Sequence, residues 1–410
     1  MRQVITFLGK YPRLTHYLFN GQVWPAEVFP QALRQFIAFD RMAVFTTKEA
    51  HASAWPVLER LHDPRICEVP IALGEDQDQM WGWLDAMIEQ VSDGDVVIFD
   101  ITHGLRSIPF LVFLFAAYLK TIRQVTIEAI YYGALELGDA QTGKPAPVLD
   151  LSQFVSMLDW ITASDQFIQT GDARRLAALL QPKEPAGKAS AQAAQVLTQV
   201  SQAAFLCQPF SLMKEVEKLP AALKQAELEV FTNARPFGVL NERVIQSFAP
   251  FRCKDCQDDR AVLHAEYQMI AWYAEKRQYL QMASLAREWL VDAVTFRLEK
   301  PLDYRSELRN LMERAISGLE RIGRQEKDEQ SGLVKTFGED DLNEFGKQIY
   351  YSWPEWKQVR KLWSDLSAVR NTLDHAEHQR NPVPLKTTLK KVSREILPAL
   401  KELADAWNLC

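Results

Sequence analysis

The chain has 410 residues, of which 47% are hydrophobic and 24% charged, and its formal net charge is −6. This composition is ordinary for a globular protein, and the length exceeds what one hydrophobic core normally serves, so two or three domains are expected. The acidic balance argues against a basic nucleic-acid coat but leaves room for a local basic groove. The longest apolar run, Ile108–Leu119, is too short to cross a bilayer, and no signal-peptide pattern is present, so we expect a cytoplasmic protein without membrane contact.

The five cysteines form no regular framework, which fits a reducing compartment. Cys253 and Cys256 stand at metal-ligand spacing, but a structural zinc normally needs a second pair. We therefore predict no metal site and two reduced thiols in a connecting loop.

Residues 1–155 alternate short β-rich runs with helical patterns, which predicts βαβ units around a parallel-rich sheet. The expected strands are Val4–Leu8, Met42–Thr46, Ile66–Val69, Val96–Phe99, Thr126–Tyr132 and Val148–Leu149. Helices are expected over Pro25–Phe39 and Gln77–Val91, and Leu137–Lys144 is predicted as a hairpin-like excursion.

The stretch Asp95–Ile122 combines a buried strand, a polar turn and an apolar helix with Ser107 as its N-cap. In open α/β sheets, ligands bind beyond the carboxyl ends of the strands, where turn residues and free helix N–H groups converge. The turn and the ends of two neighbouring strands supply the candidate ligand-binding residues, which are Gly9, Lys10, Thr102, His103, Gly104, Leu105, Arg106, Ser107 and Gly133. The competing interpretation is that the hydroxyls only cap the helix and the cations are solvated. Since turn residues contribute little to a core, replacing His103 and Arg106 is expected to leave the fold intact.

From Asp150 onward β signals fade and helical patterns dominate. Helices are expected over Ser152–Leu180 with a break at Gly171-Asp172, over Ala189–Leu228 with a break near Pro209, over Leu263–Phe296 with a break near Arg277, and over Glu307–Ile322, Leu342–Ile349, Glu355–His378 and Leu385–Trp407. Gln181–Gly187 is predicted as a linker, Asn233–Phe251 as a loop-punctuated segment, and Gly323–Gly332 as a polar, flexible one.

Arg370 and His375 lie five residues apart near the end of the predicted helix Glu355–His378, with Asn371 beside the arginine. An imidazole transfers protons near neutral pH and a guanidinium stabilises charge on phosphate oxygens, so the pair suits phosphodiester chemistry. In isolation, however, such a spacing is common by chance, and both residues could be solvated.

Two motifs carry a family resemblance. Asp100-Ile101-Thr102-His103-Gly104 spells D-x-T-H-G, and with the Tyr-Tyr-Gly strand end at Gly133 it resembles a group of CRISPR-associated proteins with an amino-terminal CARF domain. That resemblance implies a Rossmann-like sensor that binds cyclic oligoadenylates across a homodimer interface, with cyclic tetra-adenylate as the expected activator and no required cofactor. The R-x4-H motif at Arg370–His375 resembles that of HEPN ribonucleases, in which two protomers' motifs build one RNA-cleaving site.

The order of the two motifs is similar to that of CRISPR-associated CARF–HEPN effectors ancillary to type III systems. It implies a CARF domain over residues 1–155, a helical linker region over 156–258 and an all-helical HEPN domain over 259–410. The implied activity is metal-independent cleavage of single-stranded RNA by a homodimer or higher oligomer, with Arg370, Asn371 and His375 as catalytic residues and a 2′,3′-cyclic phosphate as product. Lys357, Arg360, Lys361, Arg370 and Arg380 are expected to line an RNA groove. Two alternatives remain open: a sensor whose helical domain does not cut, and a ring nuclease that degrades the signal through Thr102, His103 and Lys10.

Overall fold

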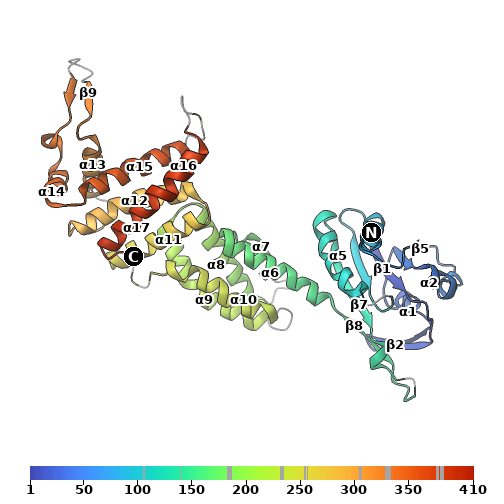
Figure 1. Cartoon of the computed structure of the whole chain (residues 1–410). Helices are drawn as coiled ribbons and strands as arrows, with labels where there is room; N and C mark the ends of the chain where they lie inside the picture. Colours follow the sequence, from blue (N-terminus) through green and yellow to red (C-terminus); the bar gives the residue numbers. More distant parts are fainter. Residues whose placement is uncertain are drawn as a thin grey trace. The chain divides into compact units, whose positions relative to one another are not determined.

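A computed structural model gives the fold and describes residues 1–104, 107–139, 141–181, 187–230, 235–253, 255, 257–303, 307–327, 334–374, 378 and 383–410; the side chains of 230, 235–237, 239, 326, 327 and 335 are not described. The chain forms two compact units, Met1–Trp160 and Ile161–Cys410, which are treated separately (Figure 1). The three-part division at 155 and 258 stays a prediction.

The first unit is built around a sheet whose strands run in the order β3-β2-β8-β7-β6-β1-β4-β5. Its described strands are β1 (Arg2–Leu8), β2 (Thr15–Phe19), β3 (Gln22–Ala26), β4 (Arg41–Thr46), β5 (Ile66–Pro70), β6 (Val96–Asp100), β7 (Thr126–Gly133) and β8 (Ala146–Asp150). The central strand β1 pairs in parallel with β4 and β6, and Ile5 lies opposite both Ala43 and Phe99. The α/β class with a parallel-rich sheet is therefore confirmed. Because these strands are parallel, their carboxyl ends meet at one edge of the sheet.

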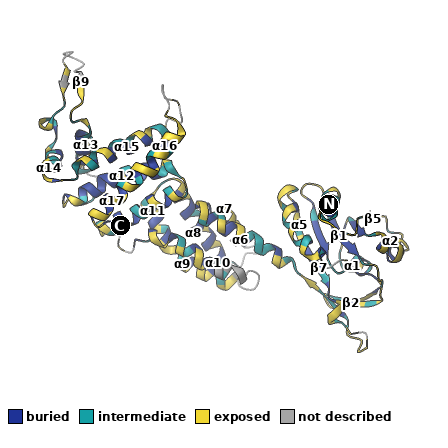
Figure 2. Cartoon of the chain, viewed as in Figure 1, coloured by how far each residue is buried: buried dark blue, intermediate teal, exposed yellow. Residues whose placement is uncertain are grey.

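Helices cover both faces of this sheet, so alternate residues of β1 enter two different cores. Val4 and Leu8 pack toward α1 (Phe29–Phe36), α2 (Lys48–Ser53) and α3 (Trp55–Glu59), whereas Ile5 and Phe7 pack toward α4 (Gln77–Gln90) and α5 (Ile108–Ile122). Double-sided burial explains why β1 and β6 read as continuous apolar runs. In Figure 2 the central strands are coloured as buried and the outer faces of the helices as exposed.

One expectation for this unit is corrected. The predicted helix Pro25–Phe39 begins later, at Phe29, because Gln22–Ala26 pairs with Thr15–Phe19 as a β-hairpin. The turn is Asn20-Gly21, where both residues have positive φ, 49° and 79°. Asn-Gly between two β-rich runs is the residue pair that tight hairpins favour, and this signal was missed.

The second unit is helical. Its helices are α6 (Ser152–Thr170, which begins in the first unit), α7 (Arg174–Leu180), α8 (Lys188–Phe205), α9 (Pro209–Val230), α10 (Arg235–Phe248), α11 (Asp259–Glu275), α12 (Tyr279–Arg297), α13 (Glu307–Arg321), α14 (Glu344–Ser352), α15 (Trp356–Asp374), α16 (Leu385–Lys391) and α17 (Leu397–Ala406). The predicted breaks near Gly171, Pro209 and Arg277 are confirmed. Gly171 ends α6 with φ +76°, and a Cβ there would lie 2.7 Å from the Trp272 ring.

Three segments of this unit differ from the expectation. Most of Asn233–Phe251 is helix α10, because Pro236 stands in its first turn, where proline is tolerated. Part of Gly323–Gly332 belongs to a small antiparallel hairpin of β9 (Gln325–Lys327) and β10 (Val334–Thr336), and 328–333 lie outside the described residues. The predicted last helix contains a π-turn at Val392–Ile396 between α16 and α17. In the described part of the chain no helix is long and apolar enough to cross a membrane.

Candidate functional site

A cavity of ≈ 390 Å³ opens at the carboxyl ends of β1, β4 and β6. Its lining includes the predicted ligand residues Gly9, Lys10, Thr102, His103 and Gly104. Its other walls come from the end of β4, the segment after β5 and helix α4, and include Thr47, Glu49 and Trp83. The volume is in the range of small-molecule sites. The sheet edge therefore brings together five of the nine predicted residues.

The other four predicted residues are not among the described residues that line the cavity. Leu105 and Arg106 lie outside the described residues. Ser107 stands at the N-cap position of α5, but its side chain makes no capping hydrogen bond. Gly133 is buried at the end of β7, and its N–H donates to the Thr102 hydroxyl at 2.8 Å.

The D-x-T part of the motif ties three strand ends together. The buried Asp100 carboxylate accepts from the Thr6 hydroxyl of β1 at 2.6 Å and from the Thr102 N–H at 2.8 Å. Burial raises the pKa of Asp100 from 3.8 to about 6. Since Thr102 in turn accepts from Gly133 on β7, one short segment joins β1, β6 and β7.

His103 joins this edge to helix α1. Its Nε2 accepts the backbone N–H of Phe29, the first residue of α1, at 3.0 Å. Helix-start N–H groups lack partners within their own helix, so His103 caps α1. Burial lowers the pKa of His103 from 6.5 to about 4, which keeps the imidazole neutral. The expectation that His103 contributes little to the fold is therefore wrong.

The neutral imidazole has one remaining donor. Because Nε2 accepts, the proton is assigned to Nδ1. Nδ1 lies on the side of Gly9, where a Cβ built on Gly9 would be 4.0 Å from it. Gly9 and His103 both line the cavity, and this N–H is the donor that His103 has left after its hydrogen bond to Phe29.

Gly104 of the D-x-T-H-G motif and Gly133 of the Tyr-Tyr-Gly strand end are required by backbone conformation and by lack of space, respectively. Gly104 has φ +112°, a region that side chains disfavour. A Cβ on Gly133 would lie 2.9 Å from the Tyr17 ring and 3.2 Å from that of Phe29. Tyr17 and Phe29 are the residues that sequence reasoning missed here. The Asn20-Gly21 turn of the β2–β3 hairpin, which contains Tyr17 and precedes α1, was the available signal.

In the second unit, Arg370 lies near the end of α15 with its side chain half exposed. Its Nε is 3.1 Å from the Asp374 carboxylate. Asn371 follows on the same helix, and His375 lies outside the described residues. The predicted apolar stripe of α15 is buried as expected at Val359, Leu362, Trp363, Leu366 and Val369.

Two contacts show which end of the unit Arg370 occupies. Arg297 pairs with Glu355 at 2.6 Å, and the Arg287 guanidinium lies 4.3 Å from the Trp363 ring centroid. Residue numbers rise along α12 as they fall along α15, so the helices are antiparallel. Continued toward the start of α12, the same register brings residues 280–281 opposite Arg370.

Several cations predicted to contact RNA make internal interactions. Arg360 donates to the Ile322 carbonyl at 2.9 Å and so caps α13. The Lys361 ammonium lies between Asp365 and Glu395, at 2.8 and 3.0 Å. Arg380 lies outside the described residues. Two of the cations predicted to line the RNA groove are therefore already bonded to other groups of the fold.

A buried acidic cluster lies between α11, α12 and α13. Burial together with the charge of Asp292 raises the pKa of Glu266 to about 8, and Oε2 of Glu266 has no hydrogen-bond partner among the described residues. Burial also raises the pKa of Asp292 to about 7, and Arg309 bridges Asp292 to Glu288. Within the described ranges no group of three or more His, Cys, Asp and Glu is placed to hold a metal ion.

The fold and the strand-end cavity define a protein with a Rossmann-like unit followed by a predominantly helical unit, the architecture that the CARF–HEPN resemblance implied. Sequence comparison places it beside CRISPR-associated proteins. The family described as CRISPR-associated protein MJ1674, second domain, matches residues 156–250. CRISPR-associated protein MJ1674 of Methanocaldococcus jannaschii is 31% identical over 166 residues, which are 39% of this chain and 24% of that protein. The predicted relation to CRISPR-associated proteins is thus confirmed.

The chain matches only about a quarter of that relative's length. A solved structure titled "Enterococcus italicus Csm6 bound to cyclic hexa-2'-fluoro-hexa-dAMP" superimposes on 99% of this chain and 94% of that chain, with a TM-score of 0.45 and 9% identity. A similarity of this size adds nothing to the argument.

Proposed function

We propose that this protein is an endoribonuclease of type III CRISPR defence that cleaves single-stranded RNA without a metal ion when a cyclic oligoadenylate binds its first unit. The observation that carries the proposal is the strand-end cavity, because the D-x-T-H-G turn forms part of its wall in a chain related to CRISPR-associated proteins. Lys10 supplies a cation for a phosphate, and His103 and the strand-end amides supply donors. The expected activator is cyclic tetra-adenylate.

A second copy of the chain is the proposed partner. On α5 the exposed apolar side chains Phe110, Leu114, Tyr118 and Ile122 recur every four residues, with exposed fractions of 69%, 47%, 47% and 42%. Residues at this spacing share one helix face. An apolar stripe of this kind favours association, and a twofold dimer presents two copies of the cavity edge to a ligand that has internal symmetry.

Cleavage is assigned to Arg370, Asn371 and His375. His375 acts as general acid or base, Arg370 binds the scissile phosphate, and Asn371 orients one of them. The RNA 2′-hydroxyl attacks the adjacent phosphorus and the 5′-oxygen leaves with a proton, so the product carries a 2′,3′-cyclic phosphate. Each chain supplies one copy of the motif, and the two copies of a dimer build the site. Asp374, paired with Arg370, holds the guanidinium in place before RNA binds.

Degradation of the ligand is the second candidate, since Lys10, Thr102 and His103 share one cavity. Its weakness is chemical: Nε2 of His103 is engaged by Phe29 and the ring has a low pKa, so His103 is a poor general base. Ring cleavage would then depend on Lys10.

The test measures cleavage of a fluorescent single-stranded RNA by the purified full chain, with and without cyclic tetra-adenylate, in EDTA. We expect ligand-dependent cleavage that His375→Ala lowers by about 10² or more. His378→Ala is the matched control, because His378 is a nearby histidine outside the motif, and it should keep activity. Cleavage that needs a divalent metal, that also acts on DNA, or that survives His375→Ala would contradict the proposal. Loss of intact ligand over time, followed in parallel, tests the second candidate.

A further inference from the structure

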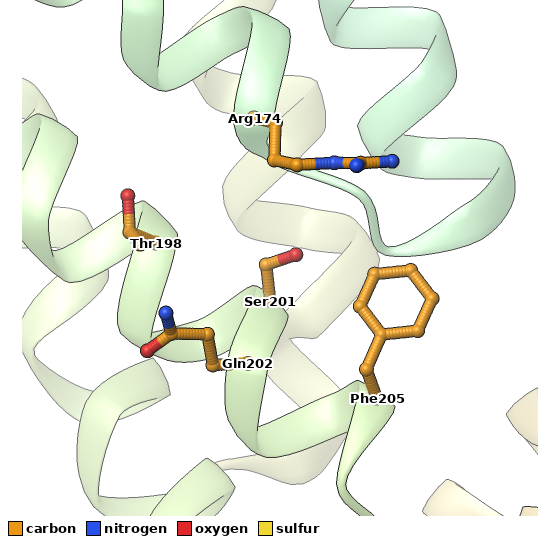
Figure 3. Close-up of a pocket in the computed structure, with 5 residues that line it drawn as sticks. All are labelled: Arg174, Thr198, Ser201, Gln202 and Phe205. Carbon is orange, nitrogen blue, oxygen red and sulfur yellow. The ribbon is translucent and has the colours of Figure 1, made fainter.

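The helical unit contains a second cavity, of ≈ 370 Å³, between α7 and α8. It is lined by Arg174, Thr198, Ser201, Gln202 and Phe205 (Figure 3). Four of these residues recur along one face of α8, at 198, 201, 202 and 205. In Figure 3 the Arg174 side chain and the Phe205 ring lie on the same side of the cavity, with Ser201 between them.

The cavity is held in shape by buried hydrogen bonds. The Ser201 hydroxyl accepts the Ala173 N–H at 3.1 Å and fixes the start of α7 on α8. The buried Asp172 carboxylate accepts from Nε and Nη2 of Arg174, at 2.9 and 2.6 Å. These contacts fix the plane of the guanidinium, although 84% of the Arg174 side chain is exposed. The Arg174 guanidinium is thus held in a fixed orientation while it remains accessible to solvent.

The lining has the chemistry of a nucleobase site. Phe205 is 43% exposed, and an exposed aromatic ring together with a guanidinium plane forms a stacking platform for a base. Gln202 offers an amide with one donor group and one acceptor, which suits the edge of a base. No acidic side chain is among the described residues that line the cavity.

The surroundings favour a strand of RNA over a free nucleotide. Arg175 and Arg277 are exposed, and neither makes an ion pair within the part of the chain that the structure describes. Arg277 precedes Gln278, whose side-chain amide donates to the Thr170 carbonyl at the end of α6, four residues before Arg174. Exposed arginines beside an aromatic ring on which a base can stack are suited to contact the phosphates of a single-stranded nucleic acid.

The cavity also lies toward the Arg370 end of the unit. The Cys207 thiol, two residues after Phe205, contacts the Gln281 carbonyl at 3.5 Å. Gln281 is level with Arg370 in the α12–α15 register, and packed helix axes are roughly 10 Å apart. Leu280, which precedes Gln281 at the start of α12, is 40% exposed.

We propose that this cavity binds one unstacked base of the single-stranded RNA whose backbone passes Arg370. The inference rests on the proposed function, because it assumes that RNA is the substrate. The cavity acts as a positioning subsite: Phe205 and Arg174 hold the base, Gln202 contacts its edge, and Arg175 and Arg277 contact flanking phosphates.

The experiment measures binding separately from cleavage. A fluorescein-labelled oligoadenylate with methylated 2′-hydroxyls is titrated with the full chain, because methylation blocks attack by the 2′-oxygen. Phe205→Ala should weaken binding at least about fivefold, the size expected for one stacked base. Phe205→Trp should retain binding. Phe210→Ala is the matched control, since Phe210 is 44% exposed and does not line the cavity, and it should bind as the parent does.

On cleavable RNA, Phe205→Ala should raise KM more than it lowers kcat. Unchanged binding by Phe205→Ala would overturn the inference while leaving ligand-activated cleavage intact. Equal weakening by Phe205→Ala and Phe210→Ala would also overturn it, because the whole apolar turn, and not the cavity, would then be responsible. If the parent chain neither binds nor cuts RNA in the presence of ligand, the proposed function itself fails.

Discussion

Replacing His103 by glutamine should change how the stability of the first unit depends on pH. The glutamine Oε1 can accept the Phe29 N–H as Nε2 does, but it does not titrate. His103 has a pKa of about 4 in the fold and 6.5 when unfolded, so between these values the unfolded chain binds more protons. The free energy of unfolding therefore falls as the pH is lowered, by about 2 kcal/mol from pH 7 to 5.

Asp100 acts in the opposite direction. Its pKa is about 6 in the fold and 3.8 when unfolded, so the folded chain binds more protons between these values. Its contribution rises by about 1 kcal/mol from pH 7 to 5. The two terms partly cancel in the parent chain. His103→Gln should therefore become more stable at pH 5 than at pH 7, and Asp100→Asn less stable.

The assay is hydrogen–deuterium exchange in increasing urea, read on peptides from β6 and α1, because a chain of two units need not unfold in one step. His16→Gln is the control, since His16 is exposed on β2 in the same unit. If His103→Gln keeps the pH dependence of the parent, His103 is not held neutral by burial, and the assignment of its Nε2 as the acceptor for α1 fails.

Two further predictions test other parts of the chain. Glu266→Gln should stabilise the second unit by about 3 kcal/mol at pH 7, because the carboxyl that it replaces has a pKa of about 8 in the fold and ionises favourably on unfolding. Hydrogen–deuterium exchange of α11 peptides measures this change, and Glu275→Gln on the same helix is the exposed control. Destabilisation by Glu266→Gln would show that Glu266 is ionised in the fold. Leu114→Glu should dissociate the proposed dimer, because it places a charge among the exposed apolar side chains of α5. Light scattering measures the mass of the particle. A mass that stays that of a dimer would show that the interface lies elsewhere.

The sequence predicted the architecture well where apolar periodicity decides the structure. The buried strands β1, β4, β6 and β7 and the breaks at Gly171 and Arg277 follow from local patterns. The β2–β3 hairpin was missed because its strands are partly exposed and because the end of β3, Pro25 and Ala26, was assigned to the following helix. Helix α10 was missed because Pro236, Gly238 and Pro250 were counted as breakers without regard to their positions at the helix ends.

The candidate site was predictable only in part. Parallel topology brought Gly9, Thr102 and Gly133 to one edge, as expected. The partner of His103 could not be predicted, because Phe29 is 74 residues away and its free N–H depends on where α1 begins. The acidic cluster was missed for the same reason: Glu266, Asp292 and Arg309 come from three helices, and no spacing along the chain relates them.

The hydrogen bonds of the D-x-T-H-G segment show which of its side-chain groups the fold uses and which remain for a ligand. Asp100 and Thr102 use their side chains to join strand ends, and His103 uses one nitrogen to cap a helix. These side chains therefore hold this edge of the sheet together, whichever molecule the edge binds.

Ligand choice must then come from groups that face the cavity and are not used by the fold. Among the described residues these include the His103 Nδ1–H, Lys10 and Tyr11. The Lys10 ammonium lies 5.1 Å from the Tyr11 ring centroid, and 79% of Tyr11 is exposed, so a base stacking on Tyr11 would bring its phosphate toward Lys10. If the proposed ligand binds this cavity, the segment after β1, rather than the D-x-T-H-G motif, is therefore where the choice of ring size should be encoded.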